Sequence, residues 1–218
     1  KKLKEIKKRK KIPILVGGTG LYFKALVDGL VKIPNIPQRV RTQIRAHRLK
    51  IGQNKFYQEL LKLDPISKDK IHPTDSHRSL RAYEVKLYTQ KSIHDWYKNT
   101  KSNFKKTDFY KIYISFPRAE LIERINLRSK KMIKNGAIKE VKNFIKLNIK
   151  KDKSVNKAIG INEITEYLNN KKKLNEITEN ISIKTRQYAK RQSTWARGNM
   201  TSWLKLKPSE LNNFLNNI

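Results

Sequence analysis

Continuous apolar runs mark two places along the chain where strands are expected. Residues 12–17 (IPILVG) are apolar throughout, which predicts a strand buried on both faces, as in a parallel sheet. Residues 109–116 (FYKIYISF) return to a strand pattern, and Pro117 ends it. Between these runs, residues 20–30 carry apolar side chains on one face and predict a helix directly after the first strand.

The remaining segments have the apolar spacing of helices. Between the two strands, short basic helices are expected at residues 39–50, 54–63 and 77–88. After the second strand, helices are expected at residues 119–136, 137–147 and about 174–195. The buried stripe predicted for the last helix consists of Ile177, Ile181, Tyr188 and Trp195.

The order of these elements predicts an α/β protein whose core is interrupted by a helical insertion. Residues 1–31 and 108–218 are expected to form the two segments of a core domain with a parallel sheet. Residues 32–107 are expected to form the insertion. The prolines of VKIPNIP (31–37) mark the first boundary, because proline favours a change of chain direction.

The charge balance adds a candidate class of partner. The chain has 51 Lys and Arg against 18 Asp and Glu, a formal net charge of +33. Such an excess opposes compaction by self-repulsion and suits a polyanion, first of all a nucleic acid. The other explanation is a general drift in composition toward Lys, Asn and Ile, so the charge indicates a direction without identifying a ligand.

Cysteine count and apolar run length exclude several classes of protein. With no cysteine, disulfides, thiolate zinc sites and cysteine nucleophiles are ruled out. No apolar run approaches the roughly 20 residues of a membrane-spanning helix. The basic N-terminal stretch lacks the apolar segment of a signal peptide. The four histidines lack the spacing of a metal site. We therefore expect a soluble cytoplasmic protein without membrane contact.

The turn between the first strand and its helix carries the first chemical candidate. In GGTG (17–20), the glycines allow close approach to the backbone, and the first N–H groups of the helix favour anions. The stretch lacks the third glycine of a dinucleotide fingerprint and the Gly-Lys-Ser/Thr of a P-loop. Thr19 is either a helix cap or a substrate contact, because its hydroxyl can donate and accept hydrogen bonds.

Arginines at helical spacing are candidates for phosphate binding. Arg124 and Arg128 are four residues apart and share a helix face, where two guanidinium groups suit a phosphate or diphosphate. The alternative is a solvated face on which Glu120 pairs with Arg124. The long C-terminal helix carries a second row of cations, which suits phosphates or the helix dipole. Arg186, Lys190 and Arg197 lie in this row, and Lys184 and Arg191 lie beside it.

A further basic group lies at a predicted helix start. Asp75 is expected to cap the helix that begins near residue 76. His77, Arg78 and Arg81 follow in its first turns, where cations oppose the helix dipole. Because these are poor structural choices at such a position, they favour contacts with RNA or phosphate.

Five segments together resemble one family, the tRNA dimethylallyltransferases, also called tRNA isopentenyltransferases. In chain order they are PILVGGTGLYFKAL (13–26), IHPTDSHRSLRAYEV (71–85), ERINLRSKKMIKNGAIKEV (123–141), KAIGINEITEYL (157–168) and TRQYAKRQSTWARG (185–198). Each segment alone is a weak signal, but five in this order are specific. The resemblance implies a P-loop-NTPase-like core with a helical insertion that binds the anticodon arm.

The resemblance also implies a reaction and its participants. A dimethylallyl group would pass from dimethylallyl diphosphate to N6 of adenosine 37 in tRNA, with Mg²⁺ assisting. The partner would be the anticodon stem-loop of tRNA, and the enzyme would act as a monomer. Since N6 is poorly reachable in a stacked loop, the base would be drawn out into a channel.

By the same resemblance, individual residues gain expected roles. Thr19 lines the channel near N6 of the adenine and is the catalytic candidate. Arg128 and Arg124 would hold the diphosphate. The residues expected to contact the tRNA are Arg41, His77, Arg78, Ser79, Leu80, Arg81, Lys157, Ala158, Ile159, Gly160, Ile161, Asn162, Arg186, Lys190 and Arg191.

The sequence departs from the family pattern at several positions. The family's P-loop, and the aspartate expected to act as base toward N6, have no counterpart in the 218 residues. The chain thus resembles the C-terminal part of the enzyme and is expected to be inactive alone. Ile161 stands in place of a customary tyrosine, and Gln90 and Thr74 stand in place of a glycine and an asparagine.

Two other functions stay open. The chain could be a non-catalytic RNA-binding module, in which the insertion and the terminal helix supply phosphate contacts. It could also belong to a relative that prenylates free adenine nucleotides. The basic insertion and terminal helix argue against the latter, because a mononucleotide offers them nothing to hold.

Overall fold

The computed structural model describes residues 2–150 and 153–217 and divides the chain into two compact units. The first unit comprises residues 1–20 and 110–218, and the second comprises residues 21–109. The division falls within helix α2 (Gly20–Val27), earlier than the proline boundary expected from the sequence. The reason is local, because the Ser102 hydroxyl donates to the Leu26 carbonyl at 3.1 Å and ties α2 to residues near the end of the second unit.

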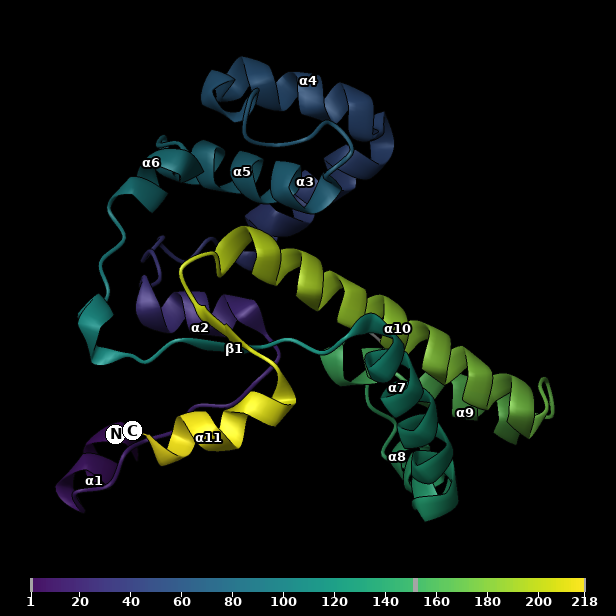
Figure 1. Cartoon of the computed structure of the whole chain (residues 1–218). Coiled ribbons are helices and arrows are strands. Elements are labelled where there is room, and N and C mark those ends of the chain that lie inside the picture. The colour runs from purple at the N-terminus through teal and green to yellow at the C-terminus, as the bar shows by residue number, and fades with distance from the viewer. Residues whose placement is uncertain (1, 151–152, 218) are drawn as a thin grey trace. The chain divides into compact units, whose positions relative to one another are not determined.

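The first unit contains a small parallel sheet and, among the described residues, the two longest helices, α7 (Arg118–Met132) and α10 (Leu174–Asn199) (Figure 1). Strands β1 (Ile112–Ile114) and β2 (Leu204–Leu206) pair in parallel, with Tyr113 opposite Lys205. This confirms the α/β class with parallel strands. The helices of this unit are α1 (Lys2–Lys8), α7 (Arg118–Met132), α8 (Ile138–Lys146), α9 (Ile161–Leu168), α10 (Leu174–Asn199) and α11 (Leu211–Asn216). Its short turns are a π-helical turn (Ile133–Ala137) and the 3₁₀ turns Ser154–Lys157 and Pro208–Glu210.

The prediction of a buried strand at residues 12–17 is wrong for the described chain. This segment has no strand partner among residues 2–150 and 153–217. Ile12, Ile14 and Val16 are 71%, 73% and 91% exposed. A strand requires neighbouring backbone to pair its N–H and C=O groups, and the two described strands pair with each other. The apolar run therefore has the composition of a central strand, but no described strand pairs with it.

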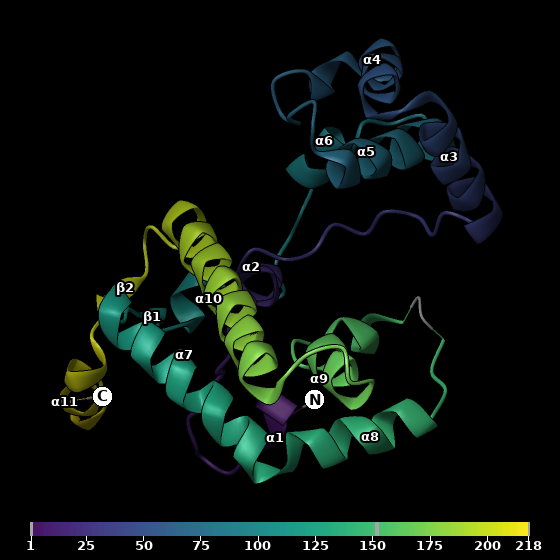
Figure 2. The ribbon, with the colours of Figure 1, turned by 90° about the vertical axis from the view of Figure 1, so that its right-hand side faces the viewer.

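The core of the first unit lies where α8 and α9 meet the start of α10. Ala137, Val141, Ile164, Ile177 and Ile181 are buried there in one cluster. Figure 2 shows α10 running alongside α7 and α9. Of the four residues predicted to form the buried stripe of α10, only Ile177 and Ile181 belong to this cluster. Farther along, Tyr188 is 42% exposed and Trp195 is half-buried, whereas Ala196 is buried.

The second unit is a helical domain. Its helices are α3 (Gln38–Ile51), α4 (Gln53–Leu63), α5 (Ser76–Thr89) and α6 (Ile93–Lys98), with 3₁₀ turns at Pro65–Ser67 and Lys106–Asp108. The three helices expected here are present, and α6 was not anticipated. Its N-cap is Ser92, whose hydroxyl also donates to the buried Asp64 carboxylate at 2.9 Å.

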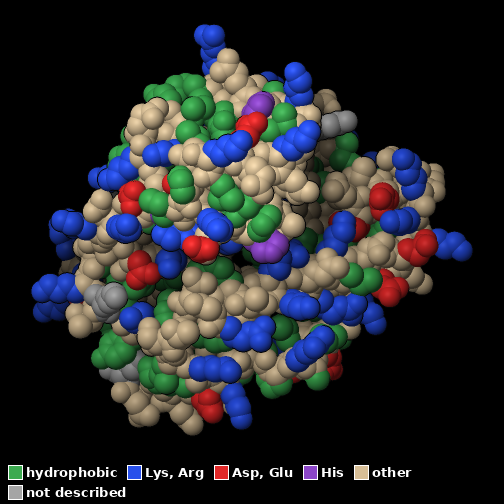
Figure 3. Space-filling model, turned by 90° about the horizontal axis from the view of Figure 1, so that it is seen from above, with side chains coloured by type: hydrophobic (Ala, Val, Ile, Leu, Met, Phe, Trp, Pro, Cys, Tyr) green, Lys and Arg blue, Asp and Glu red, His purple; other side chains and the backbone are tan. Residues whose placement is uncertain are grey.

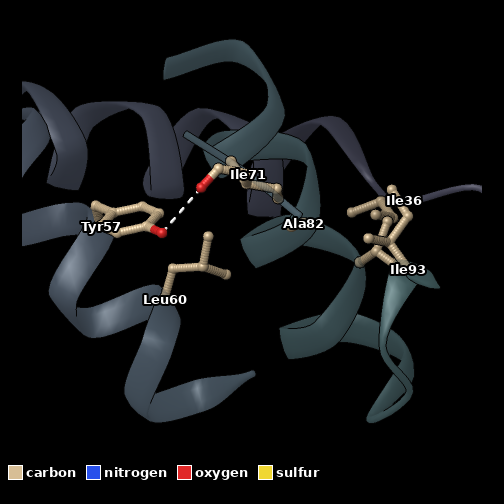
Figure 4. Close-up of a cluster of buried hydrophobic side chains, with 7 residues drawn as sticks. Ile36, Tyr57, Leu60, Ile71, Ala82 and Ile93 are labelled. Carbon is tan, nitrogen blue, oxygen red and sulfur yellow. Dashed lines mark hydrogen bonds between the residues drawn. The ribbon is translucent and has the colours of Figure 1, made fainter. Parts of the chain in front are cut away.

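A single apolar cluster holds these helices together. Figure 4 shows Tyr57 on α4 pointing at the backbone of Ile71, and the Tyr57 hydroxyl donates to the Ile71 carbonyl at 2.9 Å. The polar end of this buried tyrosine is thereby satisfied, as burial requires. The buried members of the cluster are Ile36, Tyr57, Leu60, Ile71, Ala82, Val85 and Ile93.

Candidate active site and nucleic-acid interface

The glycine-rich turn before α2 rests on the C-terminal half of α10. The Gln192 side-chain amide donates to the Gly18 carbonyl at 2.8 Å. A Cβ placed on Gly20 would overlap the Trp195 ring. Thr19 lies between these two contacts, is exposed, and makes no side-chain hydrogen bond within the described residues. A hydroxyl without an internal partner supports a substrate contact over a capping role. The sequence analysis did not single out Gln192, and it placed Trp195 in the buried stripe of the last helix without predicting its contact with this turn.

The close approach at Gly20 gives a stability prediction. Alanine normally stabilises a helix relative to glycine by about 1 kcal/mol. At Gly20 we expect the reverse, a loss of about 1–2 kcal/mol in the free energy of unfolding, because the Trp195 ring must move. Urea denaturation of Gly20→Ala measures this change in unfolding free energy. The control is Gly198→Ala on α10, where an added Cβ meets nothing within 4 Å. An unfolding free energy that rises or stays the same in both variants would contradict the close contact between Gly20 and Trp195.

A basic pocket lies along α7. It has a volume of about 490 Å³ and is open to solvent. The lining residues are Arg124, Leu127, Arg128, Lys131, Met132 and Asn135. Three cations around one hollow create a positive potential that attracts a phosphate-bearing ligand. Arg124 and Arg128, which the sequence analysis placed on one helix face, thus line the same pocket. Lys131 also lines it and was not predicted from the i, i+4 spacing.

The two arginines of the pocket differ in their surroundings. The Arg124 guanidinium lies 4.8 Å from the centre of the Phe116 ring and 3.6 Å from a Glu120 carboxylate oxygen, so the alternative pairing with Glu120 is present. Arg128 is exposed and has no ion pair or hydrogen bond among the described residues. Arg128 is therefore the arginine whose donors are free for an anion, whereas Arg124 is already partly engaged.

Residues 157–162 form a loop beside this pocket. Lys157 ends a 3₁₀ turn, and Gly160 has φ 109°, a conformation that favours glycine. A Cβ on Gly160 would lie 3.5 Å from the Met132 methyl, which lines the pocket. Ile161 and Asn162 begin α9, so the loop enters that helix directly. Of the side chains in this loop, those of Lys157, Ala158 and Asn162 are exposed, and those of Ile159 and Ile161 are half-buried.

A buried glutamate fixes the loop. The Glu163 carboxylate is 3% exposed, accepts the Gly160 N–H at 2.9 Å and pairs with Lys184 of α10. Burial alone would raise the pKa of Glu163, but the hydrogen bonds from Lys184 and from backbone N–H groups outweigh it and hold the pKa below its ordinary value. The carboxylate therefore stays ionised and positions the loop. Sequence reasoning did not identify it.

The lowered pKa of Glu163 predicts acid-sensitive stability. The carboxylate stabilises the folded chain fully above its ordinary pKa of 4.5, and this contribution is lost as the pH falls through the lower folded-state value. We expect the difference in unfolding free energy between the wild type and Glu163→Gln to shrink steadily below pH 4.5. Urea denaturation from pH 7 to pH 3 measures it, and a constant difference would contradict the ionised, paired carboxylate.

The cations of α10 occupy different environments. Arg186 is half-buried and its guanidinium lies 3.5 Å from the Asn126 amide oxygen on α7. Lys190 and Arg191 are exposed, and the Arg191 guanidinium lies 5.7 Å from the Tyr188 ring centre. Lys190 has no partner among the described residues and can meet a phosphate, whereas Arg191 also contacts the Tyr188 ring and Arg186 also helps to join α10 to α7. Lys and Arg side chains are spread over the face of the molecule in Figure 3, with acidic ones fewer among them.

In the second unit, three arginines surround one buried carboxylate. Glu84 is 1% exposed. Its carboxylate oxygens lie 3.5 Å from Arg41 Nε, 3.9 Å from Arg45 Nε and 3.5 Å from an Arg81 terminal nitrogen. The arginine side chains are 36–48% exposed, so their guanidinium groups reach the surface. Two expected tRNA contacts, Arg41 and Arg81, thus share an anchor that sequence reasoning did not reveal, as it also missed Arg45.

The start of α5 agrees in part with the sequence prediction. Asp75 caps the helix, accepting the Arg78 N–H at 3.0 Å, as expected. The side chains of His77 and Arg78 are exposed, and Leu80 is half-buried. Ser79 is fully buried and its hydroxyl donates to the Asp75 carbonyl at 2.7 Å. The Ser79 side chain therefore supports the helix start and is not presented to a ligand.

Two classes of feature are absent from the described part of the chain. Residues 2–150 and 153–217 contain no group of three His, Asp or Glu side chains that could hold a metal ion. Within the same residues, no helix combines the length and apolarity that a membrane crossing needs.

A parallel sheet with long helices in one unit, and a helical unit that carries an arginine cluster, place the chain among the α/β proteins. A family model described as IPP transferase matches residues 1–199, and the chain belongs to that family. This membership confirms the resemblance inferred from the five sequence segments.

Curated relatives carry the name tRNA dimethylallyltransferase. The chain is 59% identical over 215 residues to that of Pelagibacter ubique, covering 99% of this chain and 69% of the relative. It is 41% identical to that of Rickettsia massiliae over 94% of this chain and 57% of the relative, and 37% identical to that of Agrobacterium fabrum over 94% and 70%. The chain therefore spans 57–70% of the length of these relatives.

Solved structures agree with the sequence relatives. The full-length tRNA isopentenylpyrophosphate transferase of Bacillus halodurans is 29% identical, with a TM-score of 0.59 over 99% of this chain and 69% of that chain. A eukaryotic dimethylallyltransferase acting on tRNA is 26% identical, with a TM-score of 0.75 over 94% of this chain and 54% of that chain. The fold of this family is thus the fold of the present chain.

Proposed function

We propose that the chain supplies the larger part of an enzyme that transfers a dimethylallyl group from dimethylallyl diphosphate to N6 of adenosine 37 in tRNA. The observation that carries this proposal is the 59% identity to a relative named tRNA dimethylallyltransferase over 99% of the chain. The basic pocket on α7 and the arginine cluster of the helical unit supply independent support, because the reaction needs sites for a diphosphate and for RNA phosphates.

The reaction exchanges one bond for another at an allylic carbon. The N6 amine attacks C1 of the dimethylallyl group, the bond between C1 and the diphosphate oxygen breaks, and pyrophosphate leaves with the electron pair. N6 loses one proton to a general base. The Thr19 hydroxyl is exposed at the turn before α2 and orients N6. The base itself is the aspartate of the family segment that these 218 residues do not contain.

The diphosphate binds in the pocket on α7. Arg128 supplies a guanidinium whose donors are free, Lys131 supplies a second charge, and Arg124 contributes more weakly because it is engaged with Glu120 and Phe116. These cations stabilise the negative charge that develops on the leaving pyrophosphate.

The anticodon stem-loop binds at the basic side chains of both units. We assign direct phosphate or base contacts to the exposed or half-exposed groups and a supporting role to Ser79. The assigned contacts are Arg41, His77, Arg78, Arg81, Lys157, Asn162, Lys190 and Arg191, with Leu80, Ala158, Ile159, Gly160, Ile161 and Arg186 shaping the same surfaces.

The described residues do not build a magnesium site by themselves, since they contain no cluster of three acidic or histidine side chains. We infer that Mg²⁺ enters with the diphosphate, whose oxygens are the hard ligands it prefers. We further propose that the enzyme acts as a monomer in the cytoplasm, where its tRNA substrate is found.

A transfer assay tests the proposed function. Labelled dimethylallyl diphosphate, tRNA and Mg²⁺ are incubated with the 218-residue chain and, separately, with the chain joined to the upstream segment of the Pelagibacter ubique relative. Because the P-loop and the aspartate are outside these residues, we expect labelled tRNA only in the second reaction. The alternative, a non-catalytic RNA-binding module, predicts salt-dependent tRNA binding in both and transfer in neither.

A further inference from the structure

The turn that carries Thr19 is held by one side chain from a distant part of the sequence. Gln192 donates its amide N–H to the Gly18 carbonyl at 2.8 Å across 174 positions of sequence. In the described part of the chain, no other hydrogen bond reaches the backbone of residues 12–18. Among the described residues, the hydrogen bond that holds this turn therefore comes from Gln192 and not from a paired strand.

The glycines of the turn are fitted to α10. A Cβ on Gly18 would overlap the Gln192 side-chain nitrogen, and a Cβ on Gly20 would overlap the Trp195 ring. Gln192 and Trp195 are three residues apart on α10, so both project from the same side of that helix. Thr19 thus lies between two contacts with α10, the hydrogen bond from Gln192 to Gly18 and the packing of Gly20 on Trp195.

The helix that provides these contacts is itself well anchored. Ile177 and Ile181 of α10 are buried at 0% and 2% exposure, and Lys184 pairs with the buried Glu163 of α9. Gln192 therefore extends from a rigid element, which is what precise placement of a reacting group requires.

We propose that Gln192 is a positioning residue that sets the Thr19 hydroxyl for the incoming N6 amine, with Trp195 as a steric stop on the other side of the turn. This proposal rests on the proposed function. Its physical basis is that a displacement of about 1 Å at a reacting centre can cost about 100-fold in rate. Since the Gln192 hydrogen bond is exposed, its loss has little effect on the global stability of the chain.

Gln192→Met tests the proposal, because methionine retains the length of the side chain and removes the donor. The matched control is Gln187→Met, at an exposed position of the same helix. In the chain joined to the upstream segment, we expect kcat to fall by about 10- to 100-fold for Gln192→Met. KM for tRNA and for the diphosphate, and the melting temperature, should stay within the range of the control, because the phosphate contacts are untouched.

Two measurements, kcat and amide hydrogen exchange, distinguish a failure of the Gln192 proposal from a failure of the proposed function. If the wild type transfers the dimethylallyl group, a kcat for Gln192→Met within two-fold of the control would overturn the positioning role. If the wild type transfers nothing, the proposed function fails, and amide hydrogen exchange in the 218-residue chain decides the positioning role alone. Faster exchange of residues 17–21 in Gln192→Met than in Gln187→Met supports it, and equal exchange refutes it.

Discussion

Replacing Arg128 by alanine is expected to lower kcat/KM for prenyl transfer by about 100- to 1000-fold. The reason is the difference between the two arginines of the α7 pocket. Arg128 has no partner among the described residues, whereas Arg124 is engaged with Glu120 and the Phe116 ring. A free guanidinium can form the bidentate contacts that a diphosphate favours. We therefore expect Arg124→Ala to have the smaller effect of the two.

Lys130→Ala is the matched control for Arg128→Ala. It removes one positive charge from the same helix, but Lys130 does not line the pocket. If the lower kcat/KM came from the change in net charge alone, both variants would lose the same amount. Steady-state kinetics at varied concentrations of dimethylallyl diphosphate measure kcat/KM for each variant. Equal values for Arg128→Ala and Lys130→Ala would exclude Arg128 as the main diphosphate ligand.

Glu84→Ala is expected to destabilise the helical unit by about 2–3 kcal/mol. The Glu84 carboxylate is buried beneath Arg41, Arg45 and Arg81. Its removal leaves three like charges close together and empties the buried volume of the side chain. Breaking a fully buried ion pair costs about 3–5 kcal/mol. The expected cost is lower here because the arginines are partly exposed and can turn toward water.

Urea denaturation combined with amide exchange of α5 measures this effect. Glu59→Ala is the control, since Glu59 pairs with His47 at 2.7 Å while both side chains are 41% exposed. An exposed pair contributes at most about 1 kcal/mol. Similar destabilisation in both variants would show that Glu84 does not anchor the arginine cluster. We also expect weaker tRNA binding by Glu84→Ala, because Arg41 and Arg81 lose their common support.

Local sequence signals predicted the longer helices and the N-cap of α5, but not the short helices α6, α9 and α11. Asp75 caps α5 as its residue type and position indicated, and the spacing of Arg124 and Arg128 placed both in one pocket. These features depend on residues within a few positions of each other, where propensity and helical periodicity are decisive. The family resemblance rested on the same short segments.

The errors and omissions concern contacts between distant residues. The strand expected at residues 12–17 failed because pairing depends on neighbouring strands, not on the apolar run itself. Gln192 was missed because its partner, Gly18, lies 174 positions away. Glu84 and Glu163 read as ordinary helix positions, and only the structure shows that each is buried against cations.

The measurement that tests the central claim most directly is mass spectrometry of adenosine 37. A tRNA with adenosines at positions 36 to 38 is incubated with dimethylallyl diphosphate, Mg²⁺ and the chain joined to the upstream family segment, then digested to nucleosides. We expect a mass gain of one dimethylallyl group on N6 of adenosine 37, and a much smaller modified fraction in the same time when Arg128 is replaced by alanine. Unmodified adenosine, despite binding of both substrates, would contradict the proposed transferase function.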